Sequence, residues 1–233
     1  MTKDDIVSWL KERQNEDNRK GMAKFGINTE KAVGVKVEEL RTLAKDIGKN
    51  HSLAVELWDT DIHEARILAT IIAEPEKADN FLLDEWAEDI NSWDLCDQFC
   101  NNYVYHTEFA RAKIIEWCIR DEAYVKRAGF SVMASYALKH PDLREKDVDG
   151  FFGLILNECW DKRNYVRKAV SWALRNIGKR SLHYNRKAVR IAKQMKEENL
   201  KPAKETASEA IKELQKADLL KKLKEKDESP SST

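Results

Sequence analysis

The chain has 233 residues, of which 42% are hydrophobic and 35% charged, and its 41 basic side chains balance its 41 acidic ones. No apolar run approaches the roughly 18 residues that a membrane helix needs, and the acidic, amphipathic start "MTKDDIVSWLKERQNED" is not typical of a secretory signal. We therefore expect an intracellular, cytoplasmic protein with no membrane partner. With only 8 glycines and 4 prolines among long segments of 3.6-residue apolar period, the expected fold is all-α.

Helices are predicted along almost the whole chain, in successive pairs. Residues 1–30 are expected to form an N-terminal helical cap of a single domain that ends at residue 220. The charged, Ser/Pro-containing residues 221–233 are expected to be a disordered tail. In chain order the predicted helices are 3–27, 37–47, 52–58, 63–72, 81–90, 93–103, 108–119, 124–139, 148–160, 164–177, 186–198 and 202–220.

Several of these helices repeat one another. "YVKRAGFSVMASYAL" from Tyr124 aligns without gaps with "YVRKAVSWALRNIGK" from Tyr165, at an offset of 41 residues, and "ETASEAIKEL" from Glu205 matches "KAVSWALRNI" from Lys168 at an offset of 37. "HEARILATII" fits the same template, with Arg66 at the position of the later basic residues. Helical pairs with this period are typical of a HEAT-like α-solenoid, an α-α superhelix whose second helices line one concave groove.

The neutral total charge hides two segments of opposite sign. Residues 51–100 carry 13 acidic and 2 basic side chains, a balance of −11, and residues 162–204 carry 14 basic and 2 acidic ones, a balance of +12. A local excess of this size can hold a polyanion such as nucleic acid. The alternative is that both segments are simply solvated helical faces.

Motifs for most enzyme classes are absent from the sequence. There is no Gly-rich phosphate loop, no nucleophile elbow, no HExxH, and no serine or cysteine with a nearby histidine. The four cysteines lie in apolar helical segments without a second pair at zinc-ligand spacing, so we expect buried, reduced thiols. No metal and no cofactor is predicted.

The stretch "NSWDLCDQFCNN" places Trp93 and Asp97 four residues apart, on one face of a predicted helix. Trp172 lies in "KAVSWALR" between Lys168 and Arg175. Each of these side chains alone has a structural explanation, as a core aromatic, a helix cap or a solvated charge. Together, two indole rings, a carboxylate and a basic rim would complement a cation embedded in a polyanion.

The segments "SWDLCDQF", "YVKRAGF" and "YVRKAVSWALRNIGKR", with the framework segment "MAKFGI…GVKVEELRTLAKDIGK", resemble the AlkD-like DNA alkylation repair glycosylases, a HEAT-repeat family. The resemblance covers residues 5–215 and implies that the concave groove binds DNA. It implies hydrolysis of the N-glycosidic bond of cationic N3- and N7-alkylated purines in duplex DNA, without extraction of the lesion into a deep pocket. The family often places an aromatic side chain from its N-terminal helices beside the lesion, whereas "NRKGMAKFGI" offers none before Phe25.

The resemblance also implies roles for individual residues. Asp97 matches the family's catalytic aspartate in a WDxxD spacing. Arg127 matches an arginine that holds backbone phosphate. With the neighbouring cations of the basic face, the predicted site comprises Trp93, Asp97 and Trp172 as catalytic residues and Lys126, Arg127, Arg167, Lys168 and Arg175 as phosphate-binding residues.

Two non-enzymatic alternatives remain at this point. One is a non-catalytic helical-repeat protein that binds a DNA structure or a protein partner on its concave face. The other is a binder that recognises DNA damage without cleaving. Because non-catalytic relatives tend to lack the aspartate, Asp97 favours an enzyme that acts on alkylated double-stranded DNA as a monomer.

Overall fold

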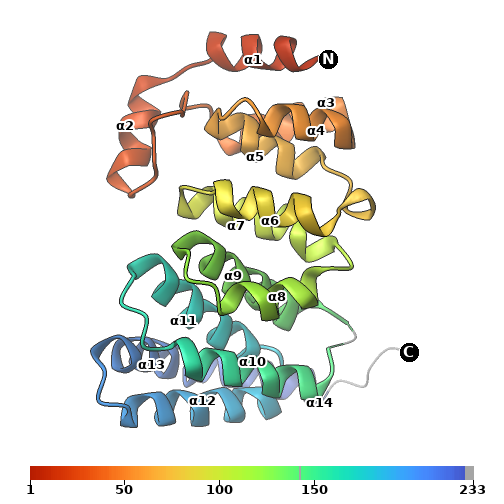
Figure 1. Ribbon diagram of the computed structural model, residues 1–233. Coiled ribbons are helices and arrows are strands. Elements are labelled where there is room, and N and C mark those ends of the chain that lie inside the picture. Colours follow the sequence, from red (N-terminus) through yellow and green to blue (C-terminus); the bar gives the residue numbers. More distant parts are fainter. Residues whose placement is uncertain (142, 229–233) are drawn as a thin grey trace. The chain divides into compact units, whose positions relative to one another are not determined.

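The computed structural model describes residues 1–141 and 143–228, and these residues form helices joined by short turns (Figure 1). The all-α prediction is confirmed. None of the described helices has the length and apolarity that crossing a membrane requires. The elements are α1 (Lys3–Glu12), α2 (Glu16–Lys24), α3 (Val37–Ile47), α4 (His51–Trp58), α5 (His63–Ile72), η1 (Pro75–Lys77), α6 (Asn80–Asp89), α7 (Trp93–Asn102), η2 (Val104–His106), α8 (Ala110–Cys118), α9 (Ala123–Lys139), α10 (Glu145–Glu158), α11 (Asn164–Gly178), α12 (Leu182–Glu197), α13 (Lys201–Leu214) and α14 (Ala217–Glu228).

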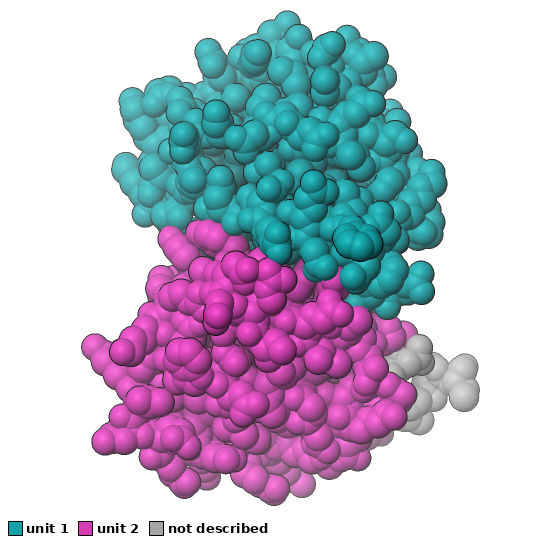
Figure 2. Space-filling model, viewed as in Figure 1, with its two compact units in different colours: residues 1–110 teal, residues 111–233 magenta. Residues whose placement is uncertain are grey.

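The chain predicted as one domain divides into two compact units, residues 1–110 and 111–233 (Figure 2). In unit 1, α5 packs against α3, α4 and α7. In unit 2, α9, α11 and α13 pack side by side, α10 and α12 pack together behind them, and α14 packs on α12. Successive helix pairs thus stack within each unit, which is the arrangement expected of HEAT-like repeats.

Tyr124 and Tyr165, which the repeat alignment places at the same position, are neighbours in the structure. Their rings stack with centroids 6.0 Å apart, at the starts of α9 and α11. Arg127 Nη1 donates to the carbonyl oxygen of Tyr165 at 2.7 Å, which joins the same two helices. The segments that match in sequence therefore lie side by side, one repeat apart.

Aromatic side chains fill the core of unit 1. Trp58 and Trp86 stack with centroids 4.2 Å apart and planes 2° from parallel, and Phe99 and Tyr103 pack around them. Both tryptophans are 1% exposed, and burial of such large rings dominates core energetics. The four cysteines are buried and unbridged, as expected, and burial raises the pKa of the Cys118 thiol well above its usual value.

Three predicted boundaries are wrong, one of them because the helix predicted over 202–220 is divided into α13 and α14. The cap predicted as one helix over residues 3–27 breaks at 13–15, because the Asn15 side chain caps α2 and its backbone N–H donates to the carbonyl of Val33. The tail predicted to be disordered from residue 221 is helical to Glu228. It is held by the buried Leu223 and by Asp227, which accepts from the N–H of Leu182 at 3.1 Å. Residues 229–233 lie outside the described part.

The contact of α9 with α8 depends on a glycine. A Cβ added at Gly129 would lie 2.6 Å from the backbone nitrogen of Cys118, so the two helix backbones meet at a distance that only glycine allows. We expect Gly129→Ala to lower the free energy of unfolding by about 1–3 kcal/mol, as overpacking does.

The matched control is Gly150→Ala on α10, where an added Cβ meets nothing within 4 Å. Because alanine is the better helix former, this variant should gain up to about 1 kcal/mol. Denaturant melts of both proteins measure the difference. Equal free energies of unfolding for the two variants would show that α8 and α9 can accommodate a Cβ at position 129 without loss of stability.

Candidate functional site

Helix α7 carries the first half of the predicted site. Trp93 and Asp97 both lie on its partly exposed face, one turn apart as predicted. The opposite face is anchored in the core of unit 1 by Leu95, Cys96, Phe99 and Cys100. The apolar spacing of "WDLCDQFC" therefore fixes which way the tryptophan and the carboxylate point.

Trp93 is held by a contact that the sequence did not reveal. Its indole Nε1 donates to the carbonyl oxygen of Phe25 at 3.1 Å, so the C-terminal end of α2 lies against the start of α7. The Phe25 ring itself is 75% exposed. The contact with Trp93 is therefore made by the backbone of Phe25, which follows α2.

Asp94, beside Trp93, forms a buried polar network. Its Oδ2 lies 2.9 Å from Nε2 of His63 at the start of α5, and Ser92 donates its hydroxyl to Oδ1. Burial by itself lowers the pKa of His63, but the hydrogen bond and the charge of Asp94 outweigh it and raise that pKa. Burial raises the pKa of Asp94, and the contact with His63 outweighs it and lowers that pKa. This pair locks the first turn of α7 onto α5.

The second half of the predicted site lies on α11 in unit 2. Lys168 is exposed and Trp172 is half-buried, and a spacing of four residues puts them on one face. Arg175 follows one turn later and is also half-buried. Each half of the predicted site is therefore assembled within its own unit.

A row of carboxylates from α13 faces the basic row of α11. Arg167 pairs with Glu205 at 3.5 Å, the Ser171 hydroxyl donates to Glu209 at 3.0 Å, and Arg175 pairs with Glu213. Each pair spans 38 residues, about one repeat. Glu213 also pairs with Lys179. Arg167 and Arg175, which were predicted to bind phosphate, thus already hold carboxylates.

Two further predicted phosphate ligands are enclosed. Lys126 is 2% exposed, pairs with Glu158, and places its ammonium 5.6 Å from the ring centre of Trp160. Arg127 is 5% exposed and donates to the backbone at the start of α11. Phosphate binding by Lys126 is not compatible with this position. Both side chains instead join α9 to its neighbours.

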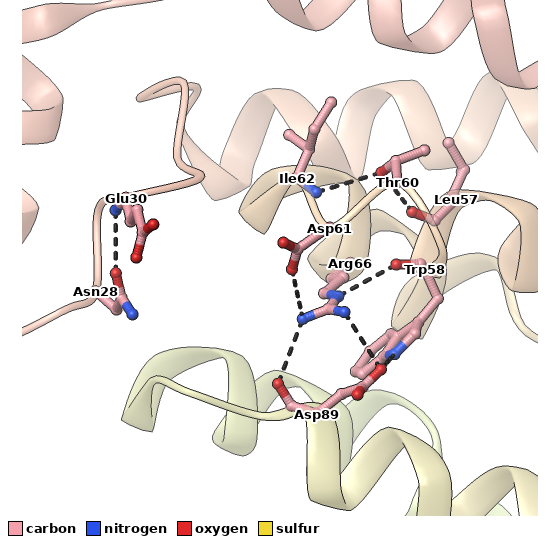
Figure 3. A network of polar contacts seen from close by, with 9 residues as sticks. All are labelled: Asn28, Glu30, Leu57, Trp58, Thr60, Asp61, Ile62, Arg66 and Asp89. Atoms are coloured by element: carbon pink, nitrogen blue, oxygen red, sulfur yellow. Dashed lines mark hydrogen bonds and ion pairs between the residues drawn. The ribbon is translucent and has the colours of Figure 1, made fainter.

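Arg66 of α5, which the repeat alignment places at the position of Arg127, also connects neighbouring elements (Figure 3). Its guanidinium lies 3.0 Å from Asp61 and 3.2 Å from Asp89, and it donates to the carbonyl oxygens of Trp58 and Asp89. At Arg66 and Arg127 the recurring basic position is therefore a tie between elements, whereas Lys168 at the same position is exposed.

The basic segment 162–204 is partly neutralised by its surroundings. Besides the α13 row, Glu145 and Asp149 of α10 pair with Lys187 at 2.5 and 3.2 Å. Such compensation is invisible in a charge count along the chain. The cations of this segment whose side chains are exposed are Lys162, Lys168, Arg186, Arg190, Lys193, Lys196, Lys201 and Lys204.

A sequence model of the DNA alkylation repair enzyme family matches residues 6–214. The chain belongs to this family. The resemblance inferred from its motifs is thereby confirmed. A search of curated proteins found no match. Among the described residues, no group of three or more His, Cys, Asp or Glu side chains is placed to hold a metal ion.

Two solved structures are similar to this family member to different degrees. One, titled "A new family of proteins related to the HEAT-like repeat DNA glycosylases with affinity for branched DNA structures", is 20% identical, with a TM-score of 0.78 over 91% of this chain and 94% of that one. A designed armadillo repeat protein in complex with a peptide is 14% identical, with a TM-score of 0.43 over 76% of this chain and 86% of that one. The first likeness establishes the HEAT-like fold.

The His63–Asp94 pair predicts a pH dependence of stability. Because the pKa of His63 is raised, its stabilisation is complete below about pH 6.5 and is lost as the pH rises through the folded-state value. Because the pKa of Asp94 is lowered, its stabilisation is present above about pH 3.9 and is lost as the pH falls through the folded-state value. Asp94→Asn should therefore lower the melting temperature most near pH 5–6, between these two limits.

The loss of a hydrogen bond between charged groups is worth about 1.5–3 kcal/mol, and each kcal/mol shifts the melting temperature by roughly 2–4 °C in a chain of this size. The exposed Asp59→Asn makes the same charge change in unit 1 as a control. A deficit of Asp94→Asn that stays constant or grows between about pH 6 and 9 would contradict the ion pair.

We expect that removing a carboxylate of α13 raises the affinity for DNA. Glu213→Gln frees Arg175 and Lys179 together, so affinity for undamaged duplex should rise by roughly two- to tenfold, with a steeper dependence on salt. Fluorescence anisotropy at several salt concentrations measures it.

Glu85→Gln, an exposed position of unit 1, adds the same net charge elsewhere and serves as the control. Equal affinities of the two variants would exclude the basic row of α11 from the DNA interface.

Proposed function

We propose that this chain is a DNA glycosylase that hydrolyses the N-glycosidic bond of cationic N3- and N7-alkylated purines in duplex DNA. The observation that carries the proposal is the placement of Trp93 and Asp97 on the accessible face of α7, in a member of the DNA alkylation repair enzyme family. In this proposal the protein acts as a cytoplasmic monomer, without metal or cofactor.

Alkylation leaves a positive charge on the purine, which makes the base a good leaving group. When the bond between the base and the sugar breaks, its electron pair neutralises the base, and positive charge develops on the deoxyribose. The Asp97 carboxylate would stabilise this charge and accept the proton of the water that attacks the sugar carbon. We assign the catalytic role to Asp97, because it stands at the position of the family's aspartate in the WDxxD spacing, whereas Asp94 holds His63 and Ser92.

The neighbouring groups have positioning roles in this proposal. The contact with Phe25 fixes the Trp93 ring, whose face would contact the cationic nucleotide for about 0.5–2 kcal/mol. In unit 2, the exposed Lys168 is the best placed phosphate ligand, with Trp172 on the same face. Arg175 would have to release Glu213 before it could bind a phosphate.

A second candidate function is DNA binding without cleavage. The observation that favours it is the use of basic side chains as structural ties, with Lys126 and Arg127 buried and Arg167 and Arg175 paired to α13. The similar structure described above is named for affinity to branched DNA, which makes a four-way junction a suitable probe. A binder would hold the junction or the duplex and release no base from either.

The deciding experiment compares wild type with Asp97→Asn on duplex DNA that contains 7-methylguanine. We expect the variant to release base at least about tenfold more slowly, a loss of roughly 1.4 kcal/mol of transition-state stabilisation, with DNA affinity and melting temperature nearly unchanged. Asp59→Asn, an exposed carboxylate of the same unit, should excise like wild type.

Two results would contradict the proposal. Excision by Asp97→Asn at the wild-type rate would make Asp97 structural. No excision by wild type, together with tight binding of the junction, would establish the second candidate instead.

A further inference from the structure

The exposed apolar side chains of unit 2 gather on one edge. In the described part of this unit, the large apolar side chains that are exposed are Ile115, Ile119, Trp160 and Leu200. Ile119, Trp160 and Leu200 are 60%, 51% and 46% exposed, and they follow one another in the chain at offsets of 41 and 40 residues, one repeat each. We call these three the apolar row. Exposed apolar side chains are normally scattered singly, so their recurrence in three successive repeats marks a surface for interaction.

Each member of the apolar row lies between the two helices of its repeat. Ile119 follows α8, Trp160 follows α10 and Leu200 follows α12. The first two turns are neighbours, because Arg163 in the α10–α11 turn donates to the carbonyl oxygen of Asp121 in the α8–α9 turn. Figure 1 shows all three turns on the same edge of unit 2. The row therefore runs along that edge from repeat to repeat.

The residues just before the row are buried, although the row itself is not. Cys118 precedes Ile119 and Cys159 precedes Trp160, and both cysteines lie in the core of unit 2. The ammonium of Lys126 lies over the Trp160 ring, 5.6 Å from its centre, and the residue is still half exposed. A tryptophan that is held in place and left accessible is a typical anchor of a protein interface.

A basic hollow of about 340 Å³ lies between the last two turns of this edge. Its charged residues are Lys162, Arg167 and Lys201 against Glu205. Lys162 and Lys201 are exposed, whereas Arg167 holds Glu205 at 3.5 Å. A second hollow of about 410 Å³ adjoins the first at Lys201 and adds the exposed Lys204. Carboxylates of a partner would therefore be attracted to this part of the edge.

The spacing of the apolar row suits an extended peptide. Packed neighbouring helices lie roughly 8–10 Å apart, and the row advances by one repeat per member. A polyproline II chain has about three residues per turn and rises about 3.1 Å per residue, so every third side chain returns to the same face after roughly 9 Å. Such a chain can place one apolar side chain against each member of the row and its carboxylates over the basic hollow.

We propose that this edge of unit 2 binds an extended, acidic segment of a partner protein whose apolar side chains recur at every third residue. Charge complementarity selects this partner, because the hollow has three basic side chains against one carboxylate. A DNA duplex would satisfy the same cations but has no apolar side chains to cover the row. The inference does not depend on the proposed glycosylase activity, since Trp93 and Asp97 belong to unit 1.

The probe for this surface is a fluorescent peptide of four Pro-Glu-Leu repeats, and its binding is followed by anisotropy. One control peptide has four Pro-Lys-Leu repeats, which reverse the charge. The other has four Pro-Glu-Ser repeats, which remove the apolar side chains. Wild type should bind the first peptide at least about tenfold more tightly than either control, a difference of roughly 1.4 kcal/mol. Equal binding of the three peptides, or no binding of the first, overturns the proposal.

A double variant, Ile119→Ser with Leu200→Ser, removes two members of the apolar row. Leu200 is the N-cap of α13 and its side chain makes no capping hydrogen bond, so serine suits this position. The double variant should bind the Pro-Glu-Leu peptide at least about tenfold more weakly than wild type. Phe81→Ser, which removes an exposed apolar side chain of unit 1, should bind it like wild type. Equal peptide affinities of these two proteins would exclude the row from the interface.

Lys162→Glu tests the hollow separately from the apolar row. It should weaken binding of the Pro-Glu-Leu peptide by at least about threefold and flatten its dependence on salt, because an attractive charge becomes a repulsive one. Lys146→Glu, in the first turn of α10, makes the same charge change at the other end of that helix and should bind like wild type. If the double serine variant melts below Phe81→Ser, the comparison of these two lysine variants decides.

The remaining outcomes distinguish the other occupants of such a surface. A double serine variant that keeps its affinity for duplex and junction DNA but has lost the peptide supports the proposal, and Asp97→Asn should bind the peptide like wild type. Loss of DNA affinity in the double variant would instead assign the row to the DNA interface. Self-association of wild type in sedimentation that the double variant abolishes would assign it to a second copy of this chain. Either of these last two results overturns the proposal.

Discussion

A single pair of helices in this chain cannot bury its own apolar face, and the whole fold depends on ties from each repeat to the next. Charged side chains make many of them. Arg66 reaches Asp61 and Asp89, Arg127 reaches the backbone of Tyr165, and the α11 row meets the carboxylates of α13. Because a buried cation needs a partner, these ties fix the register of neighbouring helices as well as their distance.

These ties limit what the basic side chains can do for DNA. A cation that holds the next repeat is neutralised by it, so the charge available to a phosphate is smaller than a count along residues 162–204 suggests. Lys168, exposed on α11, differs from its neighbours in this respect. In this member of the DNA alkylation repair enzyme family, a DNA phosphate would have to compete with the α13 carboxylates for Arg167 and Arg175.

Unit 1 concentrates the features that point to chemistry. The Ser92–Asp94–His63 network and the contact of Trp93 with Phe25 fix the first turn of α7 from two sides, and a site on such a supported helix holds its geometry better than one on a loop. A pocket lined by Phe25 and Asp94, among other residues, also opens in this unit.

Local patterns in the sequence were enough for the all-α fold, the repeats at offsets of 37 and 41 residues and the shared face of Trp93 and Asp97, because a 3.6-residue apolar period and an i, i+4 spacing are properties of one helix. The family could be inferred for the same reason, since its motifs lie within single helices. The interruption of the cap at Asn15 and the extension of α14 to Glu228 depended on contacts with Val33 and Leu182, far away in the chain. Tertiary structure alone decided which cations are enclosed, that Asp94 pairs with His63, and that the indole of Trp93 donates to the carbonyl oxygen of Phe25. Each of these joins residues about 30 to 70 positions apart, and a linear pattern carries no record of which distant side chain will meet a given charge.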